Sequence, residues 1–357
     1  ISFLYFFQKN IKNFDYFINS SLVVVLFVGI DSYIQFFNGS DIFGFKVQTS
    51  HGYRLSGPFG DEYVVGSFIS KFFFISLLYF NKIKIMKNLK LFSYFAFTII
   101  IVFLSSERAS FILLIIAVSV FLLNYESIKK IRFYILIFIV SITTVFISFN
   151  DKAKEKHLMQ YLYYANLQNV PIIENYLNNY CYMKNPNLSE IKENNPSNCL
   201  QKYGYTGVKQ ISFKDSRHGA HFLTAIEIFK SKPIIGSGIK TFRIKCKEKS
   251  YDYIDSKSKN QRCSTHPHQL YLEILAESGL LVFAMFVSII IFLLVRIFKS
   301  KNLSNYTKSI MICLMIVLFF PIQTSGSFFS TFNGIFYWLS LIVLFHVLKI
   351  KIIEQKY

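Results

Sequence analysis

Long runs of apolar residues constrain this chain more than any other feature of its sequence. A helix that crosses the ~30 Å hydrocarbon core of a bilayer needs about 20 such residues. Hydrophobic residues make up 53% of the chain and gather in blocks of about that length, rather than at the helical period of a soluble protein. We therefore expect an all-α polytopic membrane protein with about eight transmembrane helices. The predicted spans are residues 18–37, 63–80, 91–107, 109–124, 132–149, 279–298, 308–325 and 330–349.

The order of these blocks divides the chain into three parts. Residues 1–149 form an N-terminal transmembrane bundle of about five spans, and residues 269–357 form a C-terminal bundle of three. Residues 150–268 lie between them as one large segment outside the membrane. The chain begins at Ile1 with ISFLYFF, which is typical of the end of a further span, so we expect additional spans before it.

The distribution of positive charge predicts the orientation of the spans. The formal net charge of +19 would suit nucleic acid if it covered one surface, but the charges gather in alternate short connections. Connections rich in Lys and Arg face the cytoplasm. The residues concerned are Lys9, Lys12, Lys82, Lys84, Lys87, Lys90, Lys129, Lys130, Arg132, Arg296, Lys299, Lys301, Lys308, Lys349, Lys351 and Lys356.

The intervening connections carry little positive charge. The short ones hold Lys46, Arg54 and Arg108. We therefore expect the following segments to lie outside the cytoplasm: 31–62, 105–110, 150–268 and 322–331.

Cysteine placement agrees with this orientation. Four of the five cysteines, Cys181, Cys199, Cys246 and Cys263, lie in the long outer segment, and Cys313 lies in a span. An even number in an oxidising compartment favours two disulfides. Three pairings are possible, of which the sequence-local one joins Cys181 to Cys199 and Cys246 to Cys263. Free thiols are the alternative, and zinc is disfavoured because no C-x-x-C spacing occurs.

Two histidines stand at the start of the sixth span, in THPHQLYLEILAESGLL. Pro267 suits the first turn of a helix capped by Thr265 or His266, which would place His268 in that turn. The helix dipole disfavours a cation there, so His268 is expected to be neutral and able to accept a proton near pH 7.

The same helix carries a polar stripe. Gln269, Glu273 and Glu277 are four residues apart and therefore share a face. Two other interpretations of the histidines stay open. They are ordinary interfacial residues, or they bind a metal together with His218 and His221.

Three arginines are predicted on the same side of the membrane. Arg54 lies in YRLSGPFGDE, Arg108 in the short connection SSERAS, and Arg217 opens a helix. Charge beside hydrocarbon is costly, and a planar guanidinium binds phosphate with two hydrogen bonds. The three could therefore bind a lipid-borne diphosphate, with Lys71 of the second span beside them.

Each of these cations also has a structural interpretation. Arg108 could pair with Glu107, and Arg54 with Asp61 or Glu62. Lys71 could extend its side chain to the membrane interface.

Taken together, these stretches resemble the superfamily of O-antigen ligases and O-antigen polymerases, bacterial inner-membrane glycosyltransferases. The resemblance covers residues from about 50 to 290 and rests on RLSGPFGDE, SSERAS, RHGAHFLTAIEIFKSKPIIGSGIKTF and HPHQLYLEILAESGL. The last two match best, through Pro233, Gly236, Gly238, Phe242, His266, His268, Leu272, Leu275, Glu277 and Gly279. Gln269 stands where the family usually has Asn.

The resemblance implies an activity. A glycan would move from undecaprenyl diphosphate to a sugar hydroxyl of lipid A core, at the periplasmic face of the inner membrane, with inversion and without metal or cofactor. His268, Arg54, Arg108 and Arg217 are the expected catalytic residues. His266, Gln269, Glu273 and Lys71 are the expected substrate-binding residues.

Other functions stay open. An O-antigen polymerase would join two lipid-linked repeats, and a related oligosaccharyltransferase would glycosylate a protein. A transporter would move the lipid-linked glycan across the bilayer without forming a bond. Transporters usually carry charges within several spans, whereas this chain gathers its polar candidates in outer connections.

Overall fold

The computed structural model describes residues 11–48, 54–81, 87–124, 216–254, 261–321 and 326–349, together with a few isolated positions. This part of the chain is helical, apart from two isolated bridges, Ser40 with Lys46 and Gln48 with Arg54. Its main helices are α2 (Ile11–Asn38), α3 (Val65–Ser76), α4 (Lys87–Leu104), α5 (Arg108–Asn124), α11 (Arg217–Ser231), α12 (Phe242–Lys245), α14 (Leu270–Lys299), α15 (Asn305–Phe319) and α16 (Thr331–Val347). Short 3₁₀ turns follow α3 (η2, Leu77–Asn81) and α12 (η8, Lys249–Tyr251).

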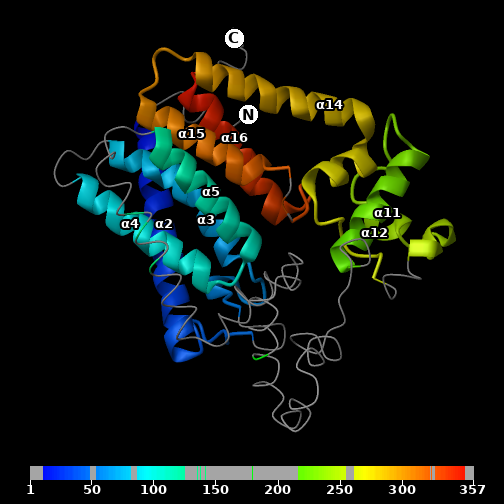
Figure 1. Cartoon of the computed structure of the whole chain (residues 1–357), viewed down its shortest axis with the longest axis horizontal. Coiled ribbons are helices and arrows are strands. Elements are labelled where there is room, and N and C mark those ends of the chain that lie inside the picture. Colours follow the sequence, from blue (N-terminus) through cyan, green and yellow to red (C-terminus); the bar gives the residue numbers. More distant parts are fainter. Residues whose placement is uncertain are drawn as a thin grey trace.

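Most of these helices form one bundle, in which α15 packs against α5 and α3, and α2 packs against α3 (Figure 1). Aromatic side chains fill its centre. The ring of Phe73 lies 5.2 Å from that of Tyr94 and 4.9 Å from that of Phe95, which in turn lies 5.4 Å from Phe121. These helices are apolar on most of their surface, so each can bury one face in the bundle and expose another.

Two of the described helices are long and apolar enough to cross a membrane, Lys12–Asn38 and Leu270–Lys299. Five shorter apolar helices accompany them: Val65–Asn81, Asn88–Leu104, Arg108–Asn124, Asn305–Phe319 and Asn333–Val347. These seven helices overlap seven of the eight expected spans, and the block 132–149 lies outside the described residues except for isolated positions. The all-helical class is therefore confirmed for this part of the chain, and the eight-span topology stays a prediction.

Contacts between helix ends define the two ends of the bundle. At one end, the carboxylate of Glu107 accepts hydrogen bonds from the backbone N–H of Gly66 (2.6 Å) and Ser67 (3.1 Å) at the start of α3. At the other end, Tyr306 Oη donates to the carbonyl of Leu77, at 2.7 Å. We call the first the site end, because the connections 105–107 and 320–330 lie there.

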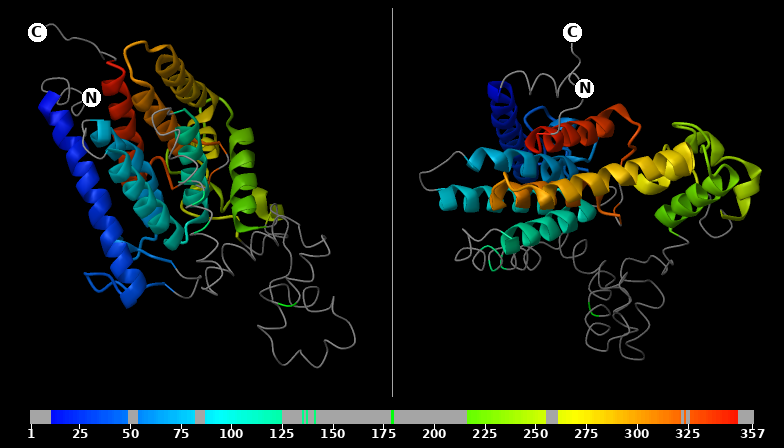
Figure 2. Two further views of the ribbon diagram at one scale, coloured as in Figure 1. Left: turned by 60° about the vertical axis from the view of Figure 1, so that its left-hand side comes forward. Right: turned by 90° about the horizontal axis from the view of Figure 1, so that it is seen from above.

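A second, smaller unit lies beside the bundle. Residues 216–254 and 261–269, called the α11 unit below, pack on the first part of α14 around a separate core (Figure 2). The buried residues of this core are Ala220, Ala225, Ile228, Phe242, Cys246, Tyr251, Ile254 and Ala276.

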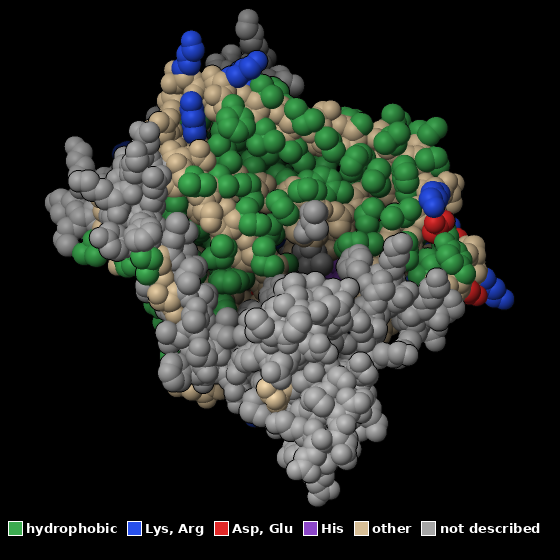
Figure 3. All heavy atoms as spheres, viewed as in Figure 1, with side chains coloured by type: hydrophobic (Ala, Val, Ile, Leu, Met, Phe, Trp, Pro, Cys, Tyr) green, Lys and Arg blue, Asp and Glu red, His purple; other side chains and the backbone are tan. Residues whose placement is uncertain are grey.

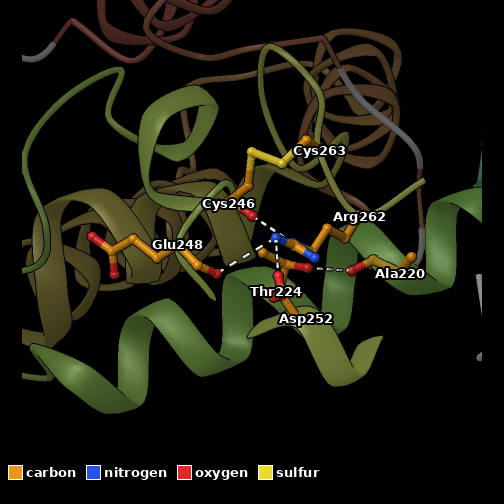
Figure 4. The surroundings of a disulfide bond; sticks show 7 residues. All are labelled: Ala220, Thr224, Cys246, Glu248, Asp252, Arg262 and Cys263. Atoms are coloured by element: carbon orange, nitrogen blue, oxygen red, sulfur yellow. Dashed lines mark hydrogen bonds and ion pairs between the residues drawn. A yellow bond between two sulfur atoms is a disulfide. The ribbon is translucent and has the colours of Figure 1, made fainter. Parts of the chain in front are cut away.

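A disulfide and a buried arginine hold the end of the α11 unit (Figure 4). Cys246 is bonded to Cys263, one of the two pairs of the sequence-local pairing, and Cys181 and Cys199 lie outside the described residues. Arg262 donates from Nε to the carbonyl of Cys246 at 2.6 Å and forms a 2.7 Å ion pair with Asp252. These contacts fix the segment that leads into the histidines.

Helix α14 is kinked at Gly279, whose φ of 75° and ψ of −178° suit only glycine. The kink frees backbone groups, and the loop after α11 satisfies them. Leu280 N donates to the carbonyl of Pro233 (2.8 Å), and Gly238 N donates to the carbonyl of Glu277 (2.8 Å). The kink and the loop therefore depend on each other.

Candidate functional site

His268 does not lie in the first turn of a helix. Helix α14 begins at Leu270, and its N-cap is Gln269, whose side-chain oxygen accepts from Leu272 N at 2.6 Å. The prediction of a helix beginning at Pro267 is therefore wrong. The cap is Gln269, and the helix begins three residues after Pro267. His268 precedes the helix with a φ of 59°, a left-handed conformation that is uncommon for a residue other than glycine.

Four histidine rings gather around this turn. The ring of His268 lies 4.0 Å from His266, 5.2 Å from His221 and 5.5 Å from His218, measured between ring centroids. Two come from α11 and two from the segment before α14. We call these four residues the histidine cluster.

Hydroxyl groups orient the cluster. His268 Nε2 is hydrogen-bonded to Ser264 Oγ at 3.0 Å, and His266 Nδ1 to Thr265 Oγ1 at 2.9 Å. His221 is fully buried, and neither of its ring nitrogens has a hydrogen-bond partner among the described residues. Sequence reasoning missed Ser264, although a hydroxyl four residues before a candidate base is a usable signal.

The environment of the cluster disfavours the charged form of its buried rings. Burial, and then the neighbouring histidines and Arg217, lower the pKa of His268 from 6.5 to about 3. Burial, His218 and Arg217 lower the pKa of His221 to about 4. His221 and His268 are therefore uncharged near pH 7, and each keeps a nitrogen lone pair.

Two of the three predicted arginines act on the cluster. Burial lowers the pKa of His218, and the positive charges of Arg217 and Arg108 lower it further. Arg217 is the first residue of α11, whose start is capped by Ser216 accepting from Gly219 N at 3.1 Å. Arg108 is the first residue of α5. The site thus lies where the bundle meets the α11 unit.

Arg54 is linked to the site less directly. Its guanidinium lies 5.9 Å from the ring centre of Tyr63 and interacts electrostatically with Glu107, the residue before Arg108. The expected structural partners were Asp61 or Glu62, and Glu107 takes that place. Because Glu107 also caps α3 and accepts from Ser110 Oγ at 3.2 Å, it holds two connections of the site end together.

Lys71 lies deeper in the bundle. Its ammonium group is 5.5 Å from the ring centre of Phe336 and 5.4 Å from that of Tyr337, and it interacts with Glu107. Lys71, a residue of α3, therefore faces α16.

The polar stripe of α14 is occupied by backbone groups of neighbouring segments. Gln269 Nε2 donates to the carbonyl of Pro321 at 2.9 Å. Glu273 accepts from Ser327 Oγ and from Phe328 N, the latter at 2.8 Å. Glu277 accepts from Lys240 N at 2.6 Å and Phe242 N at 3.0 Å. These contacts tie the histidine-bearing turn to α15, α16 and α12, which favours a positioning role for the stripe.

Among the described residues, no group of three or more His, Cys, Asp or Glu side chains is arranged to hold a metal ion.

Comparison with known proteins agrees with this geometry. The family model described as O-antigen ligase matches residues 93–287, more than half of the chain. The match includes Arg108, Arg217 and the whole histidine cluster. No curated protein and no solved structure matches the chain. The chain therefore belongs to the O-antigen ligase family, a family of membrane proteins with glycosyltransferase-like activity in lipopolysaccharide biosynthesis.

Proposed function

We propose that this protein transfers a glycan from undecaprenyl diphosphate to a sugar hydroxyl of lipid A core, at the periplasmic face of the inner membrane. The observation that carries the proposal is the neutral His268, packed in the histidine cluster where Arg108 and Arg217 contribute positive charge. A lipid-linked diphosphate needs cations beside the membrane, and a hydroxyl needs a proton acceptor.

His268 is the proposed general base. With Nε2–H donating to Ser264, Nδ1 keeps its lone pair and takes the proton of the acceptor hydroxyl. The hydroxyl oxygen then bonds to the anomeric carbon as the bond between that carbon and the phosphate oxygen breaks. Attack from the face opposite the leaving group inverts the configuration, and undecaprenyl diphosphate leaves with the bonding electrons.

Binding of the donor would raise the pKa of the proposed base. A pKa of about 3 makes free His268 a weak proton acceptor. A diphosphate beside Arg108 and Arg217 brings negative charge to the site, which raises the pKa of nearby imidazoles. Proton transfer is thereby coupled to donor binding.

The arginines stabilise the leaving group. Negative charge builds on the diphosphate oxygens as the glycosidic bond breaks, and guanidinium groups in a site of low dielectric offset it. Arg108 and Arg217 act directly in this proposal. Arg54 supports them through Glu107, and His266 and Lys71 complete the polar lining.

A matched pair of variants tests the base. In His268→Gln, we expect the rate of transfer from a synthetic undecaprenyl diphosphate glycan to fall by about 10²–10⁴-fold, the usual contribution of a positioned base. His346→Gln changes a histidine of α16 that packs on Phe14, and should retain activity. Near-normal transfer by His268→Gln would remove the base assignment.

The acceptor and the transport alternative are tested in the same assay. Lipid A core oligosaccharide and a second lipid-linked repeat are offered in parallel, because a polymerase would use the second. Movement of the glycan across proteoliposomes, without product in either arm, would identify a transporter instead.

A further inference from the structure

Three isoleucines on the loop between α11 and α12 are largely exposed. Ile234 is 62% exposed, Ile235 is 74% exposed and Ile239 is 63% exposed. They lie within seven residues that also contain three glycine or serine positions, and they take no part in the core of the α11 unit. Clustered apolar side chains of this size usually mark a binding surface.

Hydrogen bonds fix the position of this loop along α14. Leu280 N donates to the carbonyl of Pro233 at 2.8 Å, and Leu281 N donates to the carbonyl of Ile234 at 3.4 Å. The isoleucines are thereby held at the level where the exposed apolar stretch of α14 begins. Leu280 and Leu281 are themselves 52% and 60% exposed, and Figure 3 shows the hydrophobic surface along α14.

Basic residues flank the isoleucines in the sequence. Between positions 232 and 249 the chain has Lys232, Lys240, Arg243, Lys245, Lys247 and Lys249 but only Glu248 as an acid, a difference of five positive charges. Apolar side chains flanked by Lys and Arg are the composition of segments that bind at the surface of an anionic membrane.

We propose that the loop 233–239 inserts its isoleucines into the outer leaflet of the bilayer, while the flanking basic residues contact anionic phospholipid headgroups. The continuity of the loop with the exposed apolar side of α14, a helix long enough to cross a membrane, argues for bilayer rather than for a protein partner. This inference does not require the proposed reaction, because it rests on the loop and the α14 kink.

Such an anchor would set the height of the site above the membrane. The loop continues into Phe242, whose ring lies 6.5 Å from that of His221, and Glu277 holds Lys240 and Phe242 by their N–H groups. The position of the isoleucines in the membrane would thus determine the position of the histidine cluster, through Phe242 and through Glu277.

Tryptophan fluorescence of the full chain tests the anchor. The sequence has one tryptophan, Trp338, so Trp338→Phe supplies a silent background for Ile235→Trp. The protein is reconstituted in phosphatidylethanolamine–phosphatidylglycerol bilayers containing lipid brominated in the upper acyl chain. Interfacial side chains lie about 5–10 Å deep, so we expect the bromine to remove roughly half of the emission of the Ile235→Trp variant. Aqueous iodide should have little effect.

Tyr253→Trp in the same background is the matched control. Tyr253 is 59% exposed, and the yellow-green turn around residue 250 lies at the far edge of the α11 unit in Figures 1 and 2. Iodide, but not brominated lipid, should quench this tryptophan.

Three results would overturn the proposal or part of it. Quenching of the Ile235→Trp variant by iodide alone would place the loop in water. Protection from both quenchers would mean that protein covers the isoleucines, such as a second copy of the chain. Equal lipid quenching in pure phosphatidylcholine bilayers would show that the basic residues do not contribute to membrane binding through anionic headgroups.

Discussion

At the residue scale, the protonation of the histidine cluster depends on burial. The expected cause of a neutral His268 was the dipole of a helix beginning at Pro267, but the helix begins at Leu270. Burial is instead the first cause of the low pKa of both His268 and His221. The neutral state therefore depends on the packing of the site, and keeping these rings neutral lowers the stability of the fold when the pH falls.

Acidification should destabilise the fold. Histidines of an unfolded chain titrate near 6.5, whereas His268 and His221 have folded pKa values of about 3 and about 4. Below 6.5 the unfolded state binds more protons, so stability is full above that pH and falls progressively as the pH drops towards the folded values. Each pH unit costs up to about 1.4 kcal/mol for a fully buried imidazole and less for the partly exposed His268.

Thermal unfolding of the purified chain between neutral and acid pH measures this effect. His221→Leu removes one titrating ring from a fully buried position, so its unfolding midpoint should depend less on pH. The same pH dependence in wild type and His221→Leu would contradict the assignment of the low pKa to the buried ring.

A second residue-scale prediction concerns the geometry of the cation at Arg108. We expect Arg108→Ala to lower the transfer rate by about 10²–10³-fold, and Arg108→Lys to recover only part of that loss, because a lysine cannot bind phosphate with two parallel bonds. Rates with a synthetic donor measure both variants. Arg296→Lys, at the other end of α14, should leave the rate unchanged. Full activity of Arg108→Lys would show that a point charge is sufficient.

At the element scale, α14 is the helix that joins the α11 unit to the bundle. Its first part carries the tethers of Gln269 and Glu273 to the connection between α15 and α16, and its second part is the long apolar stretch. The break at Gly279 lets the two parts point in different directions, as Figure 1 shows. The loop after α11 packs closely against that break, and neither Gly236 of the loop nor Gly279 of the helix has room for a Cβ atom.

Gly279→Ala should therefore separate the two parts. A Cβ atom at this position would meet the backbone of Ile234 and Gly236, and alanine is strained at its φ of 75°. We expect the free energy of unfolding to fall by several times the ~1 kcal/mol that a change from glycine to alanine typically costs in an open turn. Limited proteolysis should then cut the α11 unit faster.

Gly39→Ala is the matched control, because Gly39 has a φ of 82° and an alanine Cβ there would have no atom within 4 Å. It shares the conformational strain and lacks the collision. Equal effects of the two variants would show that strain alone, rather than packing against the loop, determines the role of Gly279.

At the scale of the whole molecule, the disulfide holds the α11 unit in the form that presents the histidines. Cys263 immediately precedes Ser264, and the bond spans 17 residues. A closed loop of this size is worth about 3 kcal/mol in the chain-entropy model. Replacing both Cys246 and Cys263 by Ser should lower the stability of the α11 unit by that order and reduce transfer.

Hydrogen exchange along residues 246–268 measures the local effect. Cys313→Ser is the control, since Cys313 is a free thiol buried in the bundle that donates to the carbonyl of Ala117 at 3.0 Å. Its effect should be confined to α5 and α15. Unchanged exchange in the double serine variant would mean that Arg262 and the small core hold the segment without the disulfide.

The sequence alone predicted the helical class and the location of most helices, and it singled out the histidines and arginines as candidates for the site. Apolar blocks of membrane length need no tertiary information, because a backbone in hydrocarbon must satisfy its own hydrogen bonds. The histidines and arginines stood out for a related reason, since polar groups are costly at the edge of hydrocarbon.

Only the tertiary structure decided how these residues meet. The start of α14 depends on whether Thr265, His266 or Gln269 supplies the cap, and local spacing allowed each of them. The contacts of Arg54 with Glu107, of Glu107 with Gly66 and of Glu277 with Phe242 join residues 35 to 53 positions apart, beyond the reach of any local pattern. Sequence determines which groups must avoid lipid, because that cost is local, whereas packing determines which of them share a site, because contacts depend on the whole fold.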